Sequence, residues 1–367
     1  MTESTQVKPI NPMDVKPPVV DVGVIGWLRT NLFNGYLNSI ITIIIFIGLV
    51  QVIPPFIKWA FIDAFWTSPG AVCQEAGDGA CWSVVFTNFR YIIFGFYPLD
   101  QHWRPGLAMI ILFALVFYSR NRNNWKKSLA YIWLVGLIVM GFLMAGGVLG
   151  LEPVETGKWS GLPLTLLLSI IGMVASYPLG IVLALGRQSK MPAVKSICVV
   201  YIELIRGVPL ISLLFMSSVM FPLFLPEGVT INKIIRAQMA IILFWAAYIA
   251  EVVRGGLQAI NKGQYEAAES LGLNYYQKMR LIILPQALKI VIPPSVGILI
   301  SAFKDTSLVV IIALYDILNT MKSTLAHPEW MGFSTEAYLF VAALYFVLCW
   351  AMSNYSRRLE AELDYKA

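Results

Sequence analysis

The sequence predicts an all-α, polytopic membrane protein that crosses the bilayer about eight times. Of its 367 residues, 58% are hydrophobic and only 13% are charged, whereas roughly 25% are charged in an ordinary soluble domain. Apolar stretches recur along the whole chain, and a membrane-spanning helix needs about 20 such residues. The basic residues gather in the polar stretches between them. Together these observations favour a membrane channel-former over a soluble domain.

Eight spans are expected in chain order, two of them short. They lie at residues 37–62, 103–119, 129–150, 162–186, 196–224, 237–257, 287–303 and 336–355. The segment before the first span, residues 1–35, is polar and proline-rich without a cleavage-site pattern, so we expect it to form a tail and the first span to stay as an anchor. A further apolar piece, residues 306–320, would reverse the end of the chain if it crossed. We therefore expect it to form a re-entrant or interfacial helix.

The basic residues also predict the orientation. Residues 119–128 hold four basic side chains in ten, and residues 187–195 hold three in nine. Such loops stay in the cytoplasm, which places both termini there and exports the loop 63–102 to the periplasm. The net charge of +6 is then a membrane feature rather than a sign of nucleic-acid binding, because the chain has no basic runs interleaved with aromatic residues outside the spans.

The exported loop contains Cys73 and Cys81. In an oxidising compartment a structural disulfide and a pair of free thiols are equally good interpretations. The two histidines, His102 and His327, lie far apart in the chain, so we expect no metal site.

One polar segment, residues 266–285 (EAAESLGLNYYQKMRLIILP), interrupts two late apolar stretches. Its first residues should form a short helix with carboxylates in the opening turns, where they favour the helix dipole. Gly272 should end that helix and let the backbone turn back, and Pro285 should stop regular structure before the next span. The alternatives are a helix suited to a groove on another protein and a connecting loop that happens to be helical.

The spacing of this segment resembles the cytoplasmic EAA motif of ATP-binding-cassette (ABC) importer permeases. The residues that agree with the motif are Glu266, Ala267, Ala268, Gly272, Ile282, Leu284 and Pro285. Residues 201–215, 248–272 and 303–312 are similar to the polar amino acid branch of this family, and the likeness covers residues 155–360. The three leading spans, with the cysteine-containing loop, resemble the longer permeases of bacterial general L-amino acid importers.

This resemblance implies a type I permease core of five helices in residues 151–367, with a coupling loop at 258–288. Residues 36–150 would be an accessory region of three helices. Such permeases work in the bacterial inner membrane, surrounded by lipid, as a heterodimer with a second, related permease. Two copies of an ABC ATPase, which bind ATP and Mg, and a periplasmic amino-acid-binding protein complete the assembly, and the seven motif residues would couple ATP hydrolysis to import.

The chain itself has no glycine-rich loop followed by Lys and Ser or Thr. We therefore expect it to bind no cofactor and to be no enzyme. A secondary transporter or channel driven by an ion gradient is the alternative, but its hallmark is an inverted repeat with matching broken helices, and the sequence shows one break region and no convincing repeat. A purely structural membrane scaffold is a third, weaker interpretation.

Charged residues within the spans are candidates for the path of the substrate, because each costs at least about 2.5 kcal/mol at the bilayer centre unless it is partnered. Glu203 and Arg206 are three residues apart, as are Glu251 and Arg254, so each pair could be neutralised on one helix face. Two ion pairs that only hold helices in register are the structural alternative.

A break in a span is the second pointer, since Gly207 and Pro209 free backbone groups that need a neighbour or a polar cavity. Residues 304–307 (KDTS) add both charge signs and two hydroxyls, which suits an amino acid. The predicted path comprises Glu203, Arg206, Lys304, Asp305 and Ser307.

Overall fold

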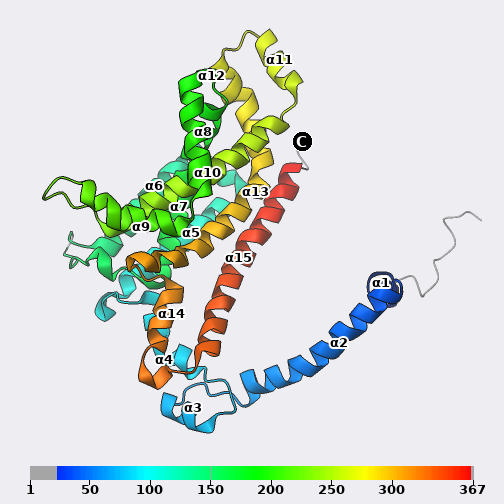
Figure 1. The fold of residues 1–367 in the computed structure, drawn as a ribbon, viewed down its shortest axis with the longest axis vertical. Coiled ribbons are helices and arrows are strands. Elements are labelled where there is room, and N and C mark those ends of the chain that lie inside the picture. Colours follow the sequence, from blue (N-terminus) through cyan, green and yellow to red (C-terminus); the bar gives the residue numbers. More distant parts are fainter. Residues whose placement is uncertain (1–22, 149, 365–367) are drawn as a thin grey trace, which may run out of the picture. The chain divides into compact units, whose positions relative to one another are not determined.

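The computed structural model describes residues 23–148 and 150–364, and every regular element among them is a helix (Figure 1). This confirms the predicted all-α class. The chain divides into two compact units, one of residues 1–65 with 72–80 and one of residues 66–71 with 81–367. Of the predicted tail 1–35, residues 1–22 lie outside the described residues.

The first unit contains two helices, α1 (Gly23–Asn31) and α2 (Tyr36–Ile57), and a π-helical turn at Lys58–Ile62. No residue of α2 is buried and none is charged. A helix that is apolar all round, with no side that differs from the others, is suited to lipid on every side. The short helix α3 (Gly70–Ala76) falls partly in each unit.

The second unit holds the remaining helices. They are α4 (Ser83–Phe94), α5 (Trp103–Arg120), α6 (Lys127–Ala145), α7 (Gly161–Arg187), α8 (Pro192–Gly207), α9 (Leu210–Phe215), α10 (Lys233–Ala259), α11 (Lys262–Ser270), α12 (Tyr275–Lys278), α13 (Leu284–Asp305), α14 (Ile317–Leu325) and α15 (Ser334–Asp364).

Seven helices of the described chain are long and apolar enough to cross a membrane, and there are eight spans if a bent pair counts as one. The bent pair consists of α8 and the helical stretch Leu210–Phe224, which meet at 104°. The sequence predicted this break, because Pro209 has no N–H to donate and Gly207 is a poor helix residue. The predicted number of spans is confirmed, and each lies close to its expected position.

Helices α7 and α10 form the centre of the second unit. In α10, 61% of the most apolar stretch is buried, and the two helices approach closely because α7 carries glycines on the shared face. A Cβ atom on Gly180 would lie 2.6 Å from Cγ2 of Ile249, which is too close for any side chain. The Ser176 hydroxyl donates a hydrogen bond of 3.0 Å to the carbonyl of Ile242. Arg187 at the end of α7 and Glu251 and Arg254 on α10 are held on this pair of helices.

The expectation of one helix over residues 306–320 is wrong. A 3-10 helix, Thr306–Ile312, ends at Ala313, whose φ of 52° is left-handed. A new helix, α14, then begins after Asp316, whose buried carboxylate accepts hydrogen bonds from the backbone N–H groups of Leu318 and Asn319. The capping carboxylate and the left-handed residue divide the segment, and the apolar composition alone does not reveal either.

Candidate functional site

The polar segment that follows α10 begins with the helix α11. The side chain of Asn261 caps its first turn by accepting a hydrogen bond of 2.8 Å from the N–H of Gly263. The helix ends at Ser270, and Gly272 adopts a left-handed φ of 70°, as expected. The N–H of Leu273 donates to the carbonyl of Ala268 at 3.2 Å, which closes the turn characteristic of a glycine-ended helix. The chain therefore reverses at a defined angle.

The return segment is helical throughout, so the prediction that Pro285 stops regular structure is wrong. Asn274 and Gln277 form a reciprocal capping box at the start of α12, with bonds of 3.1 and 2.9 Å. A π-helical turn, Met279–Ile283, then leads directly into α13. Pro285 occupies the first turn of α13, where its fixed φ is compatible with a helix. The helix tolerates Pro285 because the π-helical turn, which is wider than an α-helical turn, precedes it.

The motif residues divide between two faces of the segment. Ala268 is fully buried, Ile282 and Leu284 are half-buried, and α11 packs on the π-helical turn. Glu266 and Ala267 are exposed. Four large apolar side chains of the same segment are exposed as well, namely Leu271, Tyr275, Tyr276 and Leu281. The segment is thus anchored by one face and leaves a mixed apolar and acidic face open.

Two side-chain contacts hold α11 against the return helix. Glu269 forms an ion pair with Lys278, and the hydrogen bond and charge of Lys278 hold the pKa of the Glu269 carboxyl below its ordinary value. The amide of Gln286 donates a hydrogen bond of 3.0 Å to Gln264. These contacts join residues up to 22 positions apart and brace α11 against the return segment.

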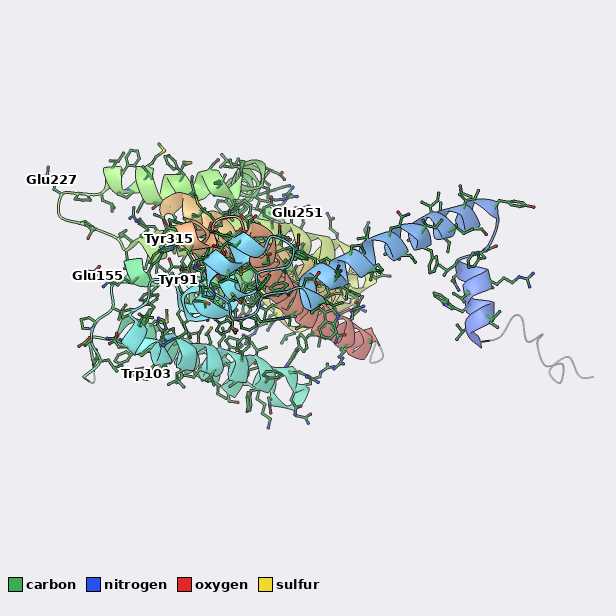
Figure 2. The ribbon with its side chains drawn as sticks, turned by 90° about the horizontal axis from the view of Figure 1, so that it is seen from below. Tyr91, Trp103, Glu155, Glu227, Glu251 and Tyr315 are labelled. Carbon is green, nitrogen blue, oxygen red and sulfur yellow. The ribbon has the colours of Figure 1, made fainter. Side chains whose placement is uncertain are left out.

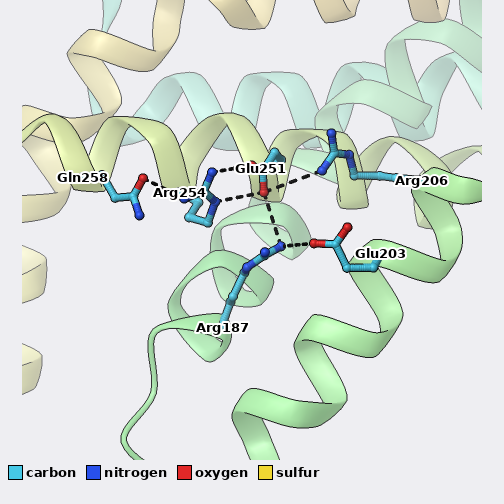
Figure 3. A network of polar contacts seen from close by, with 6 residues as sticks. All are labelled: Arg187, Glu203, Arg206, Glu251, Arg254 and Gln258. Carbon is cyan, nitrogen blue, oxygen red and sulfur yellow. Dashed lines mark hydrogen bonds and ion pairs between the residues drawn. The ribbon is translucent and has the colours of Figure 1, made fainter.

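A network of charged side chains joins the last turns of α7 and α8 to α10 (Figure 3). Glu251 is its centre. One carboxylate oxygen of Glu251 lies 3.3 Å from Nη1 of Arg187 and 3.7 Å from Nη1 of Arg206, and the carboxylate also binds Arg254, one turn further along α10. Glu203 lies 2.8 Å from Nη1 of Arg187. Three cations and two anions from three helices therefore share one cluster.

The structure corrects the predicted pairing of Glu203 with Arg206. Arg187, the last residue of α7, reaches between the helices and takes Glu203 as a partner, while Arg206 turns toward Glu251. The guanidinium of Arg206 also lies 5.6 Å from the ring centre of Tyr248. The sequence analysis assigned Arg187 only to a basic loop. Its position at the end of an apolar span was the signal that could have marked it as a partner for the intramembrane glutamates. The predicted pair Glu251 and Arg254 is confirmed.

The other predicted path residues lie elsewhere, at the end of α13 and in the following 3-10 helix. The Ser307 hydroxyl donates to the carbonyl of Lys304 at 3.0 Å, and Asn319 of α14 donates to the Ser307 carbonyl at 3.0 Å. Lys304 is exposed and Asp305 half-buried, and within the described chain neither has an ion-pair partner within 4.0 Å. The 3-10 helix packs against α9, the helix beyond the break.

Cys73 and Cys81 are both disulfide-bonded, while Cys198 and Cys349 are free thiols. Across residues 23–148 and 150–364, no group of three or more His, Cys, Asp or Glu side chains is placed to hold a metal ion.

The described chain has seven or eight helices that are long and apolar enough to cross a membrane, one of them broken, and a braced polar segment between two late spans, which together indicate a membrane transport protein. The chain belongs to the family of binding-protein-dependent transport system inner membrane components, which it matches over residues 176–361. It is similar to the inner membrane amino-acid ABC transporter permease protein YhdY of Escherichia coli (strain K12), with 48% identity over 342 residues and 92% of each chain covered.

Two further relatives extend the comparison. The glutamate/glutamine/aspartate/asparagine transport system permease protein BztC of Rhodobacter capsulatus is 37% identical over 416 residues, covering 94% of this chain and 95% of BztC. The probable glutamine ABC transporter permease protein GlnP of Bacillus subtilis is 33% identical over 202 residues, which cover 55% of this chain but 91% of GlnP. The chain is therefore the permease subunit of an ABC importer in the inner membrane. The ion-gradient alternative is not favoured.

Proposed function

We propose that this permease imports L-amino acids from the periplasm as one half of a heterodimer with a second, related permease. The energy comes from ATP, hydrolysed with Mg by two copies of a separate ABC ATPase, and a periplasmic amino-acid-binding protein delivers the substrate. The observation that carries this proposal is the segment 266–285, a rigid helical turn with an open face in a chain of this family. The names of YhdY and BztC support amino acids as the cargo.

The open face of that segment is suited to a groove on the ATPase. Leu271 and Tyr276 are 74% and 65% exposed, and Leu281 is 64% exposed. Large apolar and aromatic side chains supply most of the binding energy when they enter a pocket on a partner. Glu266 and the small Ala267 beside them allow close approach of the partner backbone. The seven motif residues would thus work in two ways, some anchoring the segment and others contacting the ATPase.

The substrate path would pass the broken helix. Arg206 lies just before the break, and the segment that holds Lys304, Asp305 and Ser307 packs against α9 just after it. An amino acid carries both charges, and these residues, together with Glu203, offer both signs. The unpartnered Lys304 and Asp305 are better placed to meet a zwitterion than side chains that are already neutralised.

The basic loops support an orientation in the membrane, and the shorter length of some relatives supports a division of the chain into two regions. Both termini and the loop 258–288 would lie in the cytoplasm, and the loop 63–102, with its bonded Cys73 and Cys81, in the oxidising periplasm. Shorter relatives such as GlnP match only about half of this chain. This supports a permease core in residues 151–367 and an accessory region in residues 36–150.

Substitution of Gly272 tests the role of the segment. Gly272→Val places a β-branched residue at a φ of 70°, which such residues avoid, and should deform the turn without touching a span. Gly272→Asn is the matched control, since asparagine tolerates this backbone conformation. The complete importer is reconstituted in proteoliposomes, and ATP-dependent amino acid uptake is measured with the binding protein present. We expect uptake to fall at least about tenfold in the valine variant and little in the asparagine variant.

Normal uptake by the valine variant, with the protein at its usual level in the membrane, would contradict the coupling role. Uptake by the wild type that needs only a proton gradient, and neither ATP nor the binding protein, would contradict the proposed function as a whole.

A further inference from the structure

The charge network connects the segment 266–285 to the broken helix. Glu251 lies on α10, and α10 continues without interruption to Ala259, about 12 Å further along at 1.5 Å per residue. Arg254 donates a hydrogen bond of 2.7 Å to Gln258 on this stretch. The hydroxyl of Tyr265, on α11, donates to the carbonyl of Leu257 at 3.2 Å. A displacement of α11 is therefore passed to the end of α10 that carries Glu251.

At its other side the network holds the end of α8 that precedes the break. Arg206 is the last residue but one of α8, and the chain bends by 104° immediately afterwards. At this joint the N–H of Val208 donates a long hydrogen bond of 3.4 Å to the carbonyl of Ile205, and Pro209 has no N–H to donate. The backbone hydrogen bonding is weak at this point, so side chains that hold α8 from outside can influence the angle of the joint.

The contacts made by Glu251 differ in tightness. Its bonds to Arg254, on the same helix, include one of 3.0 Å, while its contacts with Arg187 and Arg206, on other helices, are 3.3 and 3.7 Å. All four side chains are between 23% and 34% exposed. Glu251 lies among the helices (Figure 2), where water screens its charge only partly. The ion pairs between helices are therefore partly shielded from water but longer than the pair within α10. We expect a single substitution to weaken the contact between the helices.

We propose that Arg187, Glu203, Arg206 and Glu251 are positioning residues that lock the ends of α7, α8 and α10 together, so that movement of α11 changes the joint between α8 and α9. This inference rests on the proposed function. In the absence of the lock, α10 would slide past α8, and ATP would be hydrolysed without a matching movement of the broken helix. The number of amino acids imported for each ATP would then fall.

The test measures uptake and ATP hydrolysis together in the complete importer, reconstituted in proteoliposomes with its binding protein. Glu251→Gln removes the charge that three arginines share, and we expect the ratio of uptake to hydrolysis to fall about tenfold while hydrolysis stays within about twofold of wild type. Glu227→Gln is the matched control, because Glu227 is an exposed carboxylate in an outlying loop (Figure 2) and should leave the ratio unchanged.

A second pair of variants keeps the test decisive if Glu251→Gln does not assemble. Arg187→Gln should lower the ratio, and Arg187→Lys, which keeps the cation, should restore most of it. A merely structural network would instead lower uptake and hydrolysis in parallel, at a constant ratio, and that result would overturn the inference. If the wild-type importer shows no ATP-dependent uptake, the proposed function itself is refuted. If the wild type couples normally and the glutamine variants keep the same ratio of uptake to ATP hydrolysis, only this inference is refuted.

Discussion

The permease holds two groups of charged residues within its spans, and they differ in how they are partnered. In the charge network at the ends of α7, α8 and α10, both glutamates and all three arginines have ion-pair partners. At the end of α13, Lys304 and Asp305 have none within 4.0 Å among the described residues. A charge in a membrane span is costly unless it is neutralised. Charged residues that neutralise one another therefore stabilise the helix packing, whereas charged residues without such a partner can bind a ligand. The sequence analysis placed Glu203 and Arg206 of the first group in one path with Lys304 and Asp305, whereas in the structure only the first two have ion-pair partners among the described residues.

The largest effect is expected at the unpartnered group. Asp305→Asn removes a carboxylate that no other described side chain pairs with, so folding should be little affected, while the ammonium group of the substrate loses a contact. A hydrogen bond to a charged group contributes about 1.5 to 3 kcal/mol, which corresponds to a rise of roughly 10- to 100-fold in the KM for uptake. The measurement is uptake kinetics in proteoliposomes, with the exposed Glu155→Gln as the control. An unchanged KM would remove Asp305 from the path.

A smaller effect, on stability instead of uptake affinity, is expected at the partnered group. Glu251→Gln leaves Arg187 and Arg206 short of a counter-charge. Breaking a buried pair costs about 3 to 5 kcal/mol and an exposed one less than about 1, so we expect a loss of about 1 to 2 kcal/mol for this quarter-exposed group. Thermal unfolding of the purified permease should show a lower midpoint than for wild type or Asp305→Asn. If Glu251→Gln and Asp305→Asn unfold at the same midpoint temperature, the proposed difference in stabilising role between the two groups of charges is contradicted.

The smallest effect concerns a charged pair outside the spans, Glu269 and Lys278. Because Lys278 lowers the pKa of Glu269, the ion pair stabilises the folded segment above the ordinary carboxyl pKa, and this contribution is lost as the pH falls through the lowered value. A nitroxide label on residue 271 should therefore become more mobile upon acidification in wild type, while Glu269→Gln is mobile at every pH. A label with the same pH response in both proteins would show that the pair does not hold α11.

The sequence predicted the spans and the break because both depend on local properties. Apolar length identifies a span, and Gly207 with Pro209 interrupts a helix wherever they lie. The charge pairing could not be predicted in the same way, because Arg187 meets Glu251 across 64 positions of sequence, and only the packing of α7 on α10 brings them together. Pro285 was misinterpreted for a related reason, since the π-helical turn that accommodates it has no sequence pattern of its own.

The coupling role of the segment 266–285 is the central claim, and site-specific photocrosslinking tests it most directly. A photoreactive amino acid at Leu271, 74% exposed on the open face, should trap the ATPase subunit in membranes that contain the whole importer. The same group at Val182, 63% exposed on the side of α7, should not. If positions 271, 276 and 281 yield no adduct with the ATPase, or if they react only with reagents added from the periplasmic side, the account is contradicted.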